Sequence, residues 1–297
     1  MARVEADVYH IPVMLKECLE ALNLTSDGIY VDGTLGGGGH TAAMLEQAPA
    51  GATIVSFDAD EQAINHCSRR FADELAKGTD SRLRLVHANF STMAEALAGE
   101  PINGVLLDLG VSSYQFDHHH RGFSFRAAAP LDMRFTPEGL TAADIVNTYP
   151  EEQLTNIFRD YGDEPQSRRI AKAIVQRRAI APFKTTVDLR DVVVQHIPPQ
   201  HQPKTMARLF QALRIAVNDE LGRLQHTLES IIPLLSQGAH IVVMSYHSGE
   251  DRIVKNVFRD HPEQLRIITK KAIEAGPEEL TRNPRSRSAR LRIAERR

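Results

Sequence analysis

The sequence predicts a doubly wound α/β domain that is interrupted by an all-helical insertion. Short, continuously apolar runs alternate with helical patterns up to residue 110, no strand pattern occurs in 113–204, and the alternation then resumes. Continuous apolar runs are typical of parallel strands covered on both faces, and their alternation with helices indicates a doubly wound sheet. We therefore expect a discontinuous α/β domain, 1–112 with 205–297, and a helical domain at 113–204.

Length and composition fit an intracellular globular protein. The chain has 297 residues, 42% of them hydrophobic, which is enough for one large domain or two modest ones. No apolar run approaches the roughly 20 residues of a membrane span, and the N-terminus lacks a signal-peptide pattern. Cys18 and Cys67 show no metal spacing and are expected to be reduced core residues. These features predict a soluble, cytoplasmic protein without a membrane partner.

The first half of the α/β pattern supplies four strands. We expect strands at 28–34, 52–60, 83–90 and 104–110, with helices at 40–47, 61–76 and 91–99 between them.

Helical segments then follow one another at 141–150, 151–162, 167–179 and 185–197, separated by prolines. One long helix is expected at 208–235, followed by a strand at 239–247, a helix at 250–260 and β-like runs at 265–271 and 289–296. A terminal strand pair after five βα units is the arrangement of Rossmann-like methyltransferases, whose last strand is antiparallel to the rest.

A glycine-rich loop follows the first strand, in the stretch "YVDGTLGGGGHT". Four consecutive glycines, Gly36 to Gly39, lie where a doubly wound sheet binds ligands, and glycine lets ligand atoms approach the main chain. We expect a side chain at Gly38 to fill space that the ligand needs. No register of the loop gives the G-x-G-x-x-G pattern of dinucleotide-binding folds, which disfavours NAD.

Residues at the strand ends narrow the choice of ligand. Asp58, at the end of the second strand, is expected to accept both hydroxyls of a ribose, and Asp60 is its more solvent-facing rival. Phe90 closes the third strand, where it is expected to pack on an adenine ring. Asp108 closes the fourth, and no residue suited to hydride transfer stands out near it. S-adenosylmethionine is therefore favoured over NAD.

With these motifs the chain resembles the bacterial 16S ribosomal RNA cytosine-N4 methyltransferases. The resemblance runs from "HIPVML" to "NPRSRSARLRIAER" and includes "DGTLGGGGHT", "LLDLGVSS", "RGFSFR", "LDMR", "FQALRIAVNDEL" and "SYHSGEDRIVK". It implies a methyltransferase domain with a helical insertion after the fourth strand, S-adenosylmethionine as cofactor, and 16S rRNA or the small ribosomal subunit as partner.

The resemblance also implies the cofactor contacts, which are Gly38, Gly39, His40, Asp58, Phe90, Asp108 and Gln115. Two positions depart from the family pattern. Tyr114 replaces the usual Pro and bears on how Gln115 reaches the cofactor. Gly249 replaces the usual Leu and is expected to loosen a loop.

The chemistry of the exocyclic amine suggests the catalytic candidates. Its lone pair is delocalised into the ring, so an enzyme helps by accepting hydrogen bonds from the N–H groups and by aligning the methyl group. Asp108 is the main candidate for this role, and Ser112, Ser113 and His247 are further candidates. Loop capping remains open for the serines, and a structural role for the histidine. The run His118–His120 is expected to be a solvated or RNA-facing loop, and no metal site is predicted.

Two clusters of basic residues stand out against a net charge of −3. One consists of Arg168, Arg169, Lys172, Arg177, Arg178 and Lys184, and the other of the seven arginines in 281–297. They predict a phosphate-binding surface, with solvated helix faces as the alternative. Two other functions stay open: DNA amino methylation, disfavoured because no Pro-Pro motif follows the fourth strand, and a non-catalytic RNA-binding protein that senses S-adenosylmethionine.

Overall fold

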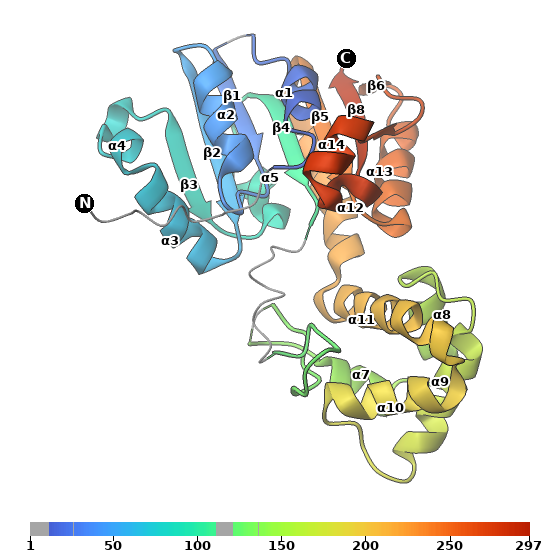
Figure 1. Cartoon of the computed structure of the whole chain (residues 1–297). Helices are drawn as coiled ribbons and strands as arrows, with labels where there is room; N and C mark the ends of the chain where they lie inside the picture. The colour runs from blue at the N-terminus through green and yellow to red at the C-terminus, as the bar shows by residue number, and fades with distance from the viewer. Residues whose placement is uncertain (1–11, 26, 111–120, 136) are drawn as a thin grey trace. The chain divides into compact units, whose positions relative to one another are not determined.

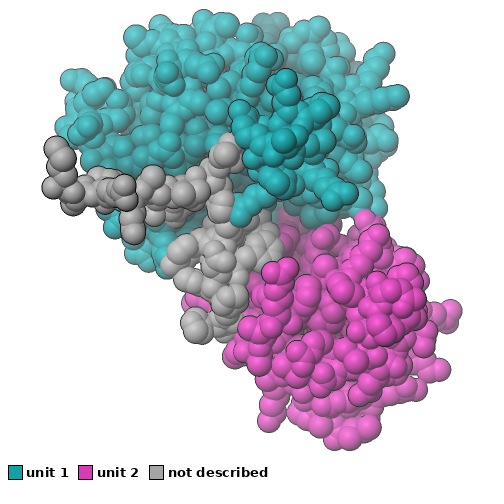
Figure 2. Space-filling model, viewed as in Figure 1, with its two compact units in different colours: residues 1–110, 223–297 teal, residues 111–222 magenta. Residues whose placement is uncertain are grey.

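The computed structural model describes residues 12–25, 27–110, 121–135 and 137–297. The chain forms two compact units, which are described separately below (Figure 2). Unit 1 comprises residues 1–110 and 223–297, and unit 2 comprises residues 111–222.

Unit 1 is built on one mixed sheet (Figure 1). The strand order is β3-β2-β1-β4-β5-β8-β6, and β7 also pairs with β8. The first five strands are parallel, whereas β8 runs antiparallel to β5, β6 and β7. The strands are β1 Gly28–Asp32, β2 Ala52–Asp58, β3 Leu83–His87, β4 Ile102–Asp108, β5 Leu235–Ser245, β6 Leu265–Ile267, β7 Ile273–Glu274 and β8 Arg290–Arg296. This is the predicted doubly wound sheet with its antiparallel last strand.

Helices cover both faces of this sheet, because the central strands are apolar on both sides. One core joins the sheet to α5 (Met93–Ala96), α12 (Glu220–Ile231) and α13 (Ser248–Asp260). The other joins it to α1 (Leu15–Leu22) and α2 (Gly39–Gln47). The remaining segments are α3 Glu61–Arg70, α4 Ala72–Leu75, α14 Pro277–Arg282 and the short 3₁₀ turns η1 Gly78–Asp80, η2 Phe90–Thr92, η5 Ile232–Leu234 and η6 Pro284–Ser288. Cys18 and Cys67 are both buried free thiols.

Unit 2 is helical, with a core of its own. Its helices are α7 Ala142–Thr148, α8 Glu151–Asp160, α9 Ser167–Arg178, α10 Thr186–His196 and α11 Gln202–Asn218, with the 3₁₀ turn η4 Pro199–His201. The apolar face of α11, including Leu209 and Leu213, packs in this core. The structure therefore groups residues 205–222 with the helical unit, whereas the sequence interpretation ended that domain at residue 204.

The prediction of a single helix at 208–235 is wrong, because the structure divides this segment into two helices at Asp219. Asp219 has a left-handed backbone conformation with φ of 48°, which ends α11, and α12 begins at the next residue. Aspartate is one of the few non-glycine residues that visit this conformation readily. Among the described helices, none is both long and apolar enough to cross a membrane.

Candidate functional site

The candidate site lies at the carboxyl edge of the sheet in unit 1. Because β2, β1 and β4 are parallel neighbours, their last residues, Asp58, Asp32 and Asp108, reach the same edge. The glycine loop connects β1 to α2 at this edge. The fold thus places three carboxylates around one loop.

The loop approaches Asp58 through its backbone. The Gly36 N–H donates to Asp58 Oδ2 at 2.8 Å, and Gly36 has a φ of 50° that favours glycine. Among the described residues, only the Thr34 carbonyl oxygen would lie within 4 Å of a Cβ added at Gly36, at 3.9 Å. Open space therefore lies beside this part of the main chain, as a ligand would require.

Gly38 serves a different purpose from the one expected. A Cβ at Gly38 would lie 2.8 Å from the Phe71 ring and 2.9 Å from Cys67 Sγ, so protein occupies the space that was assigned to ligand. Its φ of 73° adds a second reason for glycine. At Gly39 a Cβ would lie 3.0 Å from the Pro12 ring. These two glycines permit close packing of the loop, and only their backbone groups remain available to a ligand.

Asp58 is a largely buried carboxylate with two backbone donors. Besides the Gly36 bond, its Oδ1 accepts the Asp60 N–H at 2.8 Å. Burial raises the pKa of Asp58 to about 6, against the lowering effect of these two bonds. Asp60, the rival for the ribose, instead caps α3, because its side chain accepts the Gln62 N–H. Asp60 is thus engaged at the start of α3, whereas Asp58 contacts the glycine loop.

Asp32 was not singled out from the sequence. It is fully buried, and it accepts the Thr41 hydroxyl at 2.7 Å and the Thr34 N–H at 3.1 Å. Since the Thr41 proton goes to Asp32, the Ser56 hydroxyl donates to Thr41 Oγ1 at 2.8 Å. This network ties the start of the loop to α2 and β2. The only sequence indication was an acid at the end of a buried strand.

Asp108 lies between an aromatic hydroxyl and an imidazole ring. Tyr246 donates its hydroxyl to Asp108 Oδ1 at 2.7 Å, and His40 Nδ1 lies 3.8 Å from Asp108 Oδ2. Burial raises the pKa of the Asp108 carboxyl, although the His40 ring and the Tyr246 hydroxyl act in the opposite direction. Burial and the Asp108 charge raise the pKa of Tyr246, which therefore stays a neutral donor. Sequence reasoning missed Tyr246, although it precedes the candidate His247.

The His247 ring caps the start of α13. Its Nδ1 accepts the Glu250 N–H at 3.3 Å, and its Nε2 lies 3.1 Å from Glu250 Oε1. Glu250 Oε2 in turn accepts the Tyr246 N–H at 2.8 Å. This geometry favours a structural role in which the cap positions Tyr246. Gly249, expected in a loosened loop, is instead buried in the first turn of α13.

The remaining candidates divide between described and undescribed residues. Phe90 begins η2 and is half-buried, and its Cβ would lie 3.5 Å from a Cβ added at Gly33. It is thus at the ligand edge. Ser112, Ser113, Tyr114, Gln115 and His118–His120 lie outside the described residues. Within 12–25, 27–110, 121–135 and 137–297, no group of three His, Cys, Asp or Glu side chains is placed to hold a metal ion.

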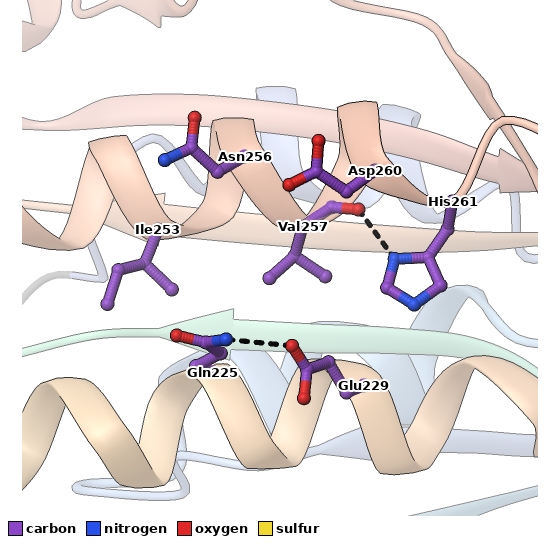
Figure 3. A pocket seen from close by; sticks show the side chains of 7 residues that line it. All are labelled: Gln225, Glu229, Ile253, Asn256, Val257, Asp260 and His261. Carbon is purple, nitrogen blue, oxygen red and sulfur yellow. Dashed lines mark hydrogen bonds between the residues drawn. The ribbon is translucent and has the colours of Figure 1, made fainter.

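A shallow pocket between α12 and α13 is separate from this edge (Figure 3). Gln225 donates to Glu229 at 2.8 Å on one side, and the His261 ring donates to the Val257 carbonyl oxygen at 2.8 Å on the other. Because α13 leaves the carboxyl end of β5 and runs back along the sheet, its last residues lie toward the opposite edge. The pocket is therefore not part of the candidate site.

Two members of the basic cluster in unit 2, Arg177 and Arg178, are structural. Arg178 donates to the Val146 and Tyr149 carbonyl oxygens at 2.9 and 2.7 Å. Arg177 lies over the Phe183 ring and 3.6 Å from Asp188. By contrast, Arg168, Arg169 and Lys172 are exposed on the first half of α9.

The C-terminal arginines divide in the same way. Arg290 and Arg292 pair with Asp251, at 3.7 and 2.6 Å, and Arg296 donates to the Gln264 carbonyl oxygen. Arg285 and Arg287, both in η6, are exposed. The arginines of β8 therefore bond mainly within unit 1, and only the exposed arginines outside β8 remain candidates for binding phosphate.

Comparison with known proteins assigns the family. The model of the MraW methylase family matches residues 7–297. The chain belongs to the MraW methylase family. It is 45% identical to a ribosomal RNA small subunit methyltransferase H of Dehalococcoides mccartyi, covering 97% of this chain and 86% of the relative. It is 44% identical to the protein of the same name from Heliobacterium mobile, covering 97% and 99%.

Among solved structures, a putative rRNA-methylase from Clostridium thermocellum is 13% identical with a TM-score of 0.47, covering 97% of this chain and 100% of that one. This weak likeness adds nothing to the family assignment.

The residues at the edge fit S-adenosylmethionine, the cofactor of such a methylase. Asp58 retains lone pairs for ribose hydroxyls, since a carboxylate accepts about four hydrogen bonds and two are used. The carboxyl groups of Asp32 and Asp108 end β1 and β4 at the same edge, where a cofactor with a sulfonium and an ammonium group would bind. The open space at Gly36 adjoins Asp58. The carboxyl groups at this edge and the open space at Gly36 are both consistent with this cofactor.

We predict that Gly38→Ala destabilises the fold more than Gly78→Ala does. Both glycines have positive φ, but a Cβ at Gly78 has no atom within 4 Å, whereas one at Gly38 meets Phe71 and Cys67. The difference in the free energy of unfolding should be about 2 kcal/mol, the usual cost of overpacking. Urea denaturation followed by circular dichroism measures it. Equal losses in the two variants would contradict the packing role.

We also predict that cofactor affinity rises with pH through about 6. The ionised Asp58 is the better acceptor for hydroxyls, and its pKa of about 6 means that the free protein is largely protonated there at pH 5. Binding measured by calorimetry should be about tenfold weaker at pH 5 than at pH 7.

Asp58→Asn is the control, because it should remove this component while leaving any contribution of Asp108. An unchanged pH dependence in this variant would contradict the assignment.

The raised pKa of Asp58 also changes the stability of the fold with pH, in a definite direction. The native pKa lies above the ordinary 3.8, so the contribution of Asp58 to stability falls as pH rises from about 4 to about 6.

Proposed function

We propose that this chain is an S-adenosylmethionine-dependent methyltransferase that methylates the N4 amine of a cytidine in 16S rRNA of the small ribosomal subunit. One observation carries the proposal. Asp58 and Asp108 flank a glycine loop at the carboxyl edge of the sheet, in a chain that matches the MraW methylase family over residues 7–297. Such an enzyme works where ribosomal subunits are assembled, so we expect it in the cytoplasm.

The cofactor would be held by residues on both sides of the loop. Asp58 would accept the ribose hydroxyls, and the half-buried Phe90 would lie against the adenine. Backbone groups of Gly38 and Gly39, together with His40 and Gln115, would complete the contacts. When bound, the cofactor supplies an electrophilic methyl group on a sulfonium.

Asp108 is the proposed catalytic residue. A carboxylate that accepts a hydrogen bond from the N4 amine favours a tetrahedral nitrogen and restores its lone pair for attack. The Tyr246 hydroxyl holds Oδ1, which leaves Oδ2 toward the His40 side of the edge. Ser112 and Ser113 remain candidates for further acceptors. His247 is more simply explained as a positioning residue, because its Nδ1 accepts the Glu250 N–H in the cap of α13.

RNA would bind to a basic face of unit 2. Arg168 and Lys172 are exposed on α9 and form no ion pair with any described residue, and Arg169 is exposed beside them. A surface of this kind neutralises phosphates without reading sequence. Recognition of a splayed cytidine would then fall to the residues of the candidate site in unit 1.

The proposed function is tested by incubating 16S rRNA, free or in assembled small subunits, with the protein and S-adenosylmethionine. Nucleoside mass spectrometry of the RNA should detect N4-methylcytidine. An Asp108→Asn variant is expected to bind RNA normally and to lose activity by at least about 10²-fold, a typical effect of removing one transition-state contact. Methylation of DNA but not RNA, or cofactor and RNA binding without any transfer, would contradict the proposal.

We predict that Arg168→Glu with Lys172→Glu weakens RNA binding and leaves cofactor affinity unchanged. The slope of log affinity against log salt should shrink by up to about 2, since each lost phosphate contact removes about 0.7–0.9. Lys255→Glu, an exposed lysine on α13, is the control. Arg177 and Arg178 are unsuitable, because their reversal would disrupt unit 2 itself. An unchanged salt slope would mean that this face is only solvated.

A further inference from the structure

Residues Pro12 to Met14 pack against the start of α2, where the cofactor loop ends. The Pro12 ring would contact any Cβ at Gly39, at 3.0 Å. The Val13 carbonyl oxygen lies 3.3 Å from His40 Nε2. A carbonyl only accepts, so this bond requires the proton on Nε2 and leaves Nδ1 facing Asp108. The segment thus determines which nitrogen of His40 faces the site.

Met14 needs external support to hold this segment in place. It is fully buried and has a left-handed backbone conformation, with φ of 48° and ψ of 40°, which is unfavourable for a non-glycine residue. Its N–H donates to Glu279 Oε1 at 3.1 Å, and its carbonyl oxygen accepts the Cys18 N–H at 2.9 Å. The bond to Glu279 therefore satisfies a buried donor in a conformation that the local sequence does not favour.

Glu279 comes from α14, 265 residues further along the chain. It is 8% exposed, and its other oxygen accepts Arg282 Nη2 at 2.8 Å. A carboxylate at this depth is unusual unless it has a specific partner. The Arg282 side chain is largely exposed, so the ion pair alone is a weak reason for burying Glu279. The buried partners of Glu279 are the Met14 N–H, at 3.1 Å, and the Asn283 side chain, whose Nδ2 donates to the same Oε1 at the longer distance of 3.5 Å.

We propose that Glu279 is a positioning residue for the cofactor site. It acts through Met14 and Val13 on the His40 ring, and through Pro12 on the packing of Gly39. The inference rests on the proposed function, because His40 and Gly39 are proposed cofactor contacts. It adds a residue from α14, which contributes no other group to that site among the described residues.

The test compares three variants with the native protein. Glu279→Met removes the acceptor at similar volume, Glu279→Gln keeps an oxygen for the Met14 N–H, and Arg282→Met removes only the ion pair. Calorimetry measures S-adenosylmethionine affinity. Nitrogen NMR of the imidazole rings in the cofactor-free protein reports whether His40 Nε2 still donates to the Val13 carbonyl oxygen.

Glu279→Met is expected to bind the cofactor about tenfold more weakly, since a buried N–H loses its acceptor. It should also shift the His40 Nε2 signal from its native position, because the hydrogen bond to the Val13 carbonyl oxygen is weakened. Glu279→Gln and Arg282→Met should match the native protein in both measurements. Native affinity and native His40 signals in Glu279→Met would overturn the inference. An equal loss of cofactor affinity in Glu279→Gln would also overturn it, because the retained acceptor for the Met14 N–H should restore native affinity.

Two further outcomes are distinguishable. If Glu279→Met does not fold, Glu279→Asp, which withdraws the acceptor by one methylene, should show the same changes to a smaller extent, and native behaviour there overturns the inference. If the native protein itself fails to bind S-adenosylmethionine, the proposed function fails, while the His40 signals of the cofactor-free variants still decide the role of Glu279.

Discussion

The arrangement of the site depends on the buried carboxylate of Asp32. Burying a carboxylate is costly unless hydrogen bonds compensate for the lost hydration. The buried Asp32 accepts such bonds from the Thr34 N–H and the Thr41 hydroxyl. These donors belong to the two ends of the glycine loop, so satisfying Asp32 determines where the loop begins and where α2 starts. Thr34 also accepts the Asp108 N–H, at 2.7 Å, through its hydroxyl oxygen. One buried group therefore links β1, α2 and β4.

The same edge brings two largely buried carboxyl groups together. Burial raises the pKa of both Asp58 and Asp108, although the hydrogen bonds that each accepts act in the opposite direction. A cofactor with hydroxyl donors and positive charge would favour the ionised form of both groups. Perturbed carboxylates in such a position are characteristic of functional sites, whereas a purely structural carboxylate would be fully paired.

Arginines in this chain illustrate that composition does not locate a binding surface. Arg178 and Arg292 lie in the two basic clusters, but each bonds within its own unit. In contrast, Arg168 and Lys172 face solvent on α9. An exposed guanidinium attracts phosphate, whereas one that already bonds carbonyl or carboxylate oxygens contributes mainly to packing and to local structure.

The sequence by itself determined the doubly wound sheet, the helical unit and the strand-end acids Asp58 and Asp108. Apolar periodicity and glycine clustering are local properties, so they survive without knowledge of the fold. The division of the helix at Asp219, the contacts of Gly38 and the cap role of His247 were decided by tertiary structure. Tyr246 and Glu279 were invisible for the same reason. Each acts on a partner 138 or 265 residues away, and no local pattern records such a pairing.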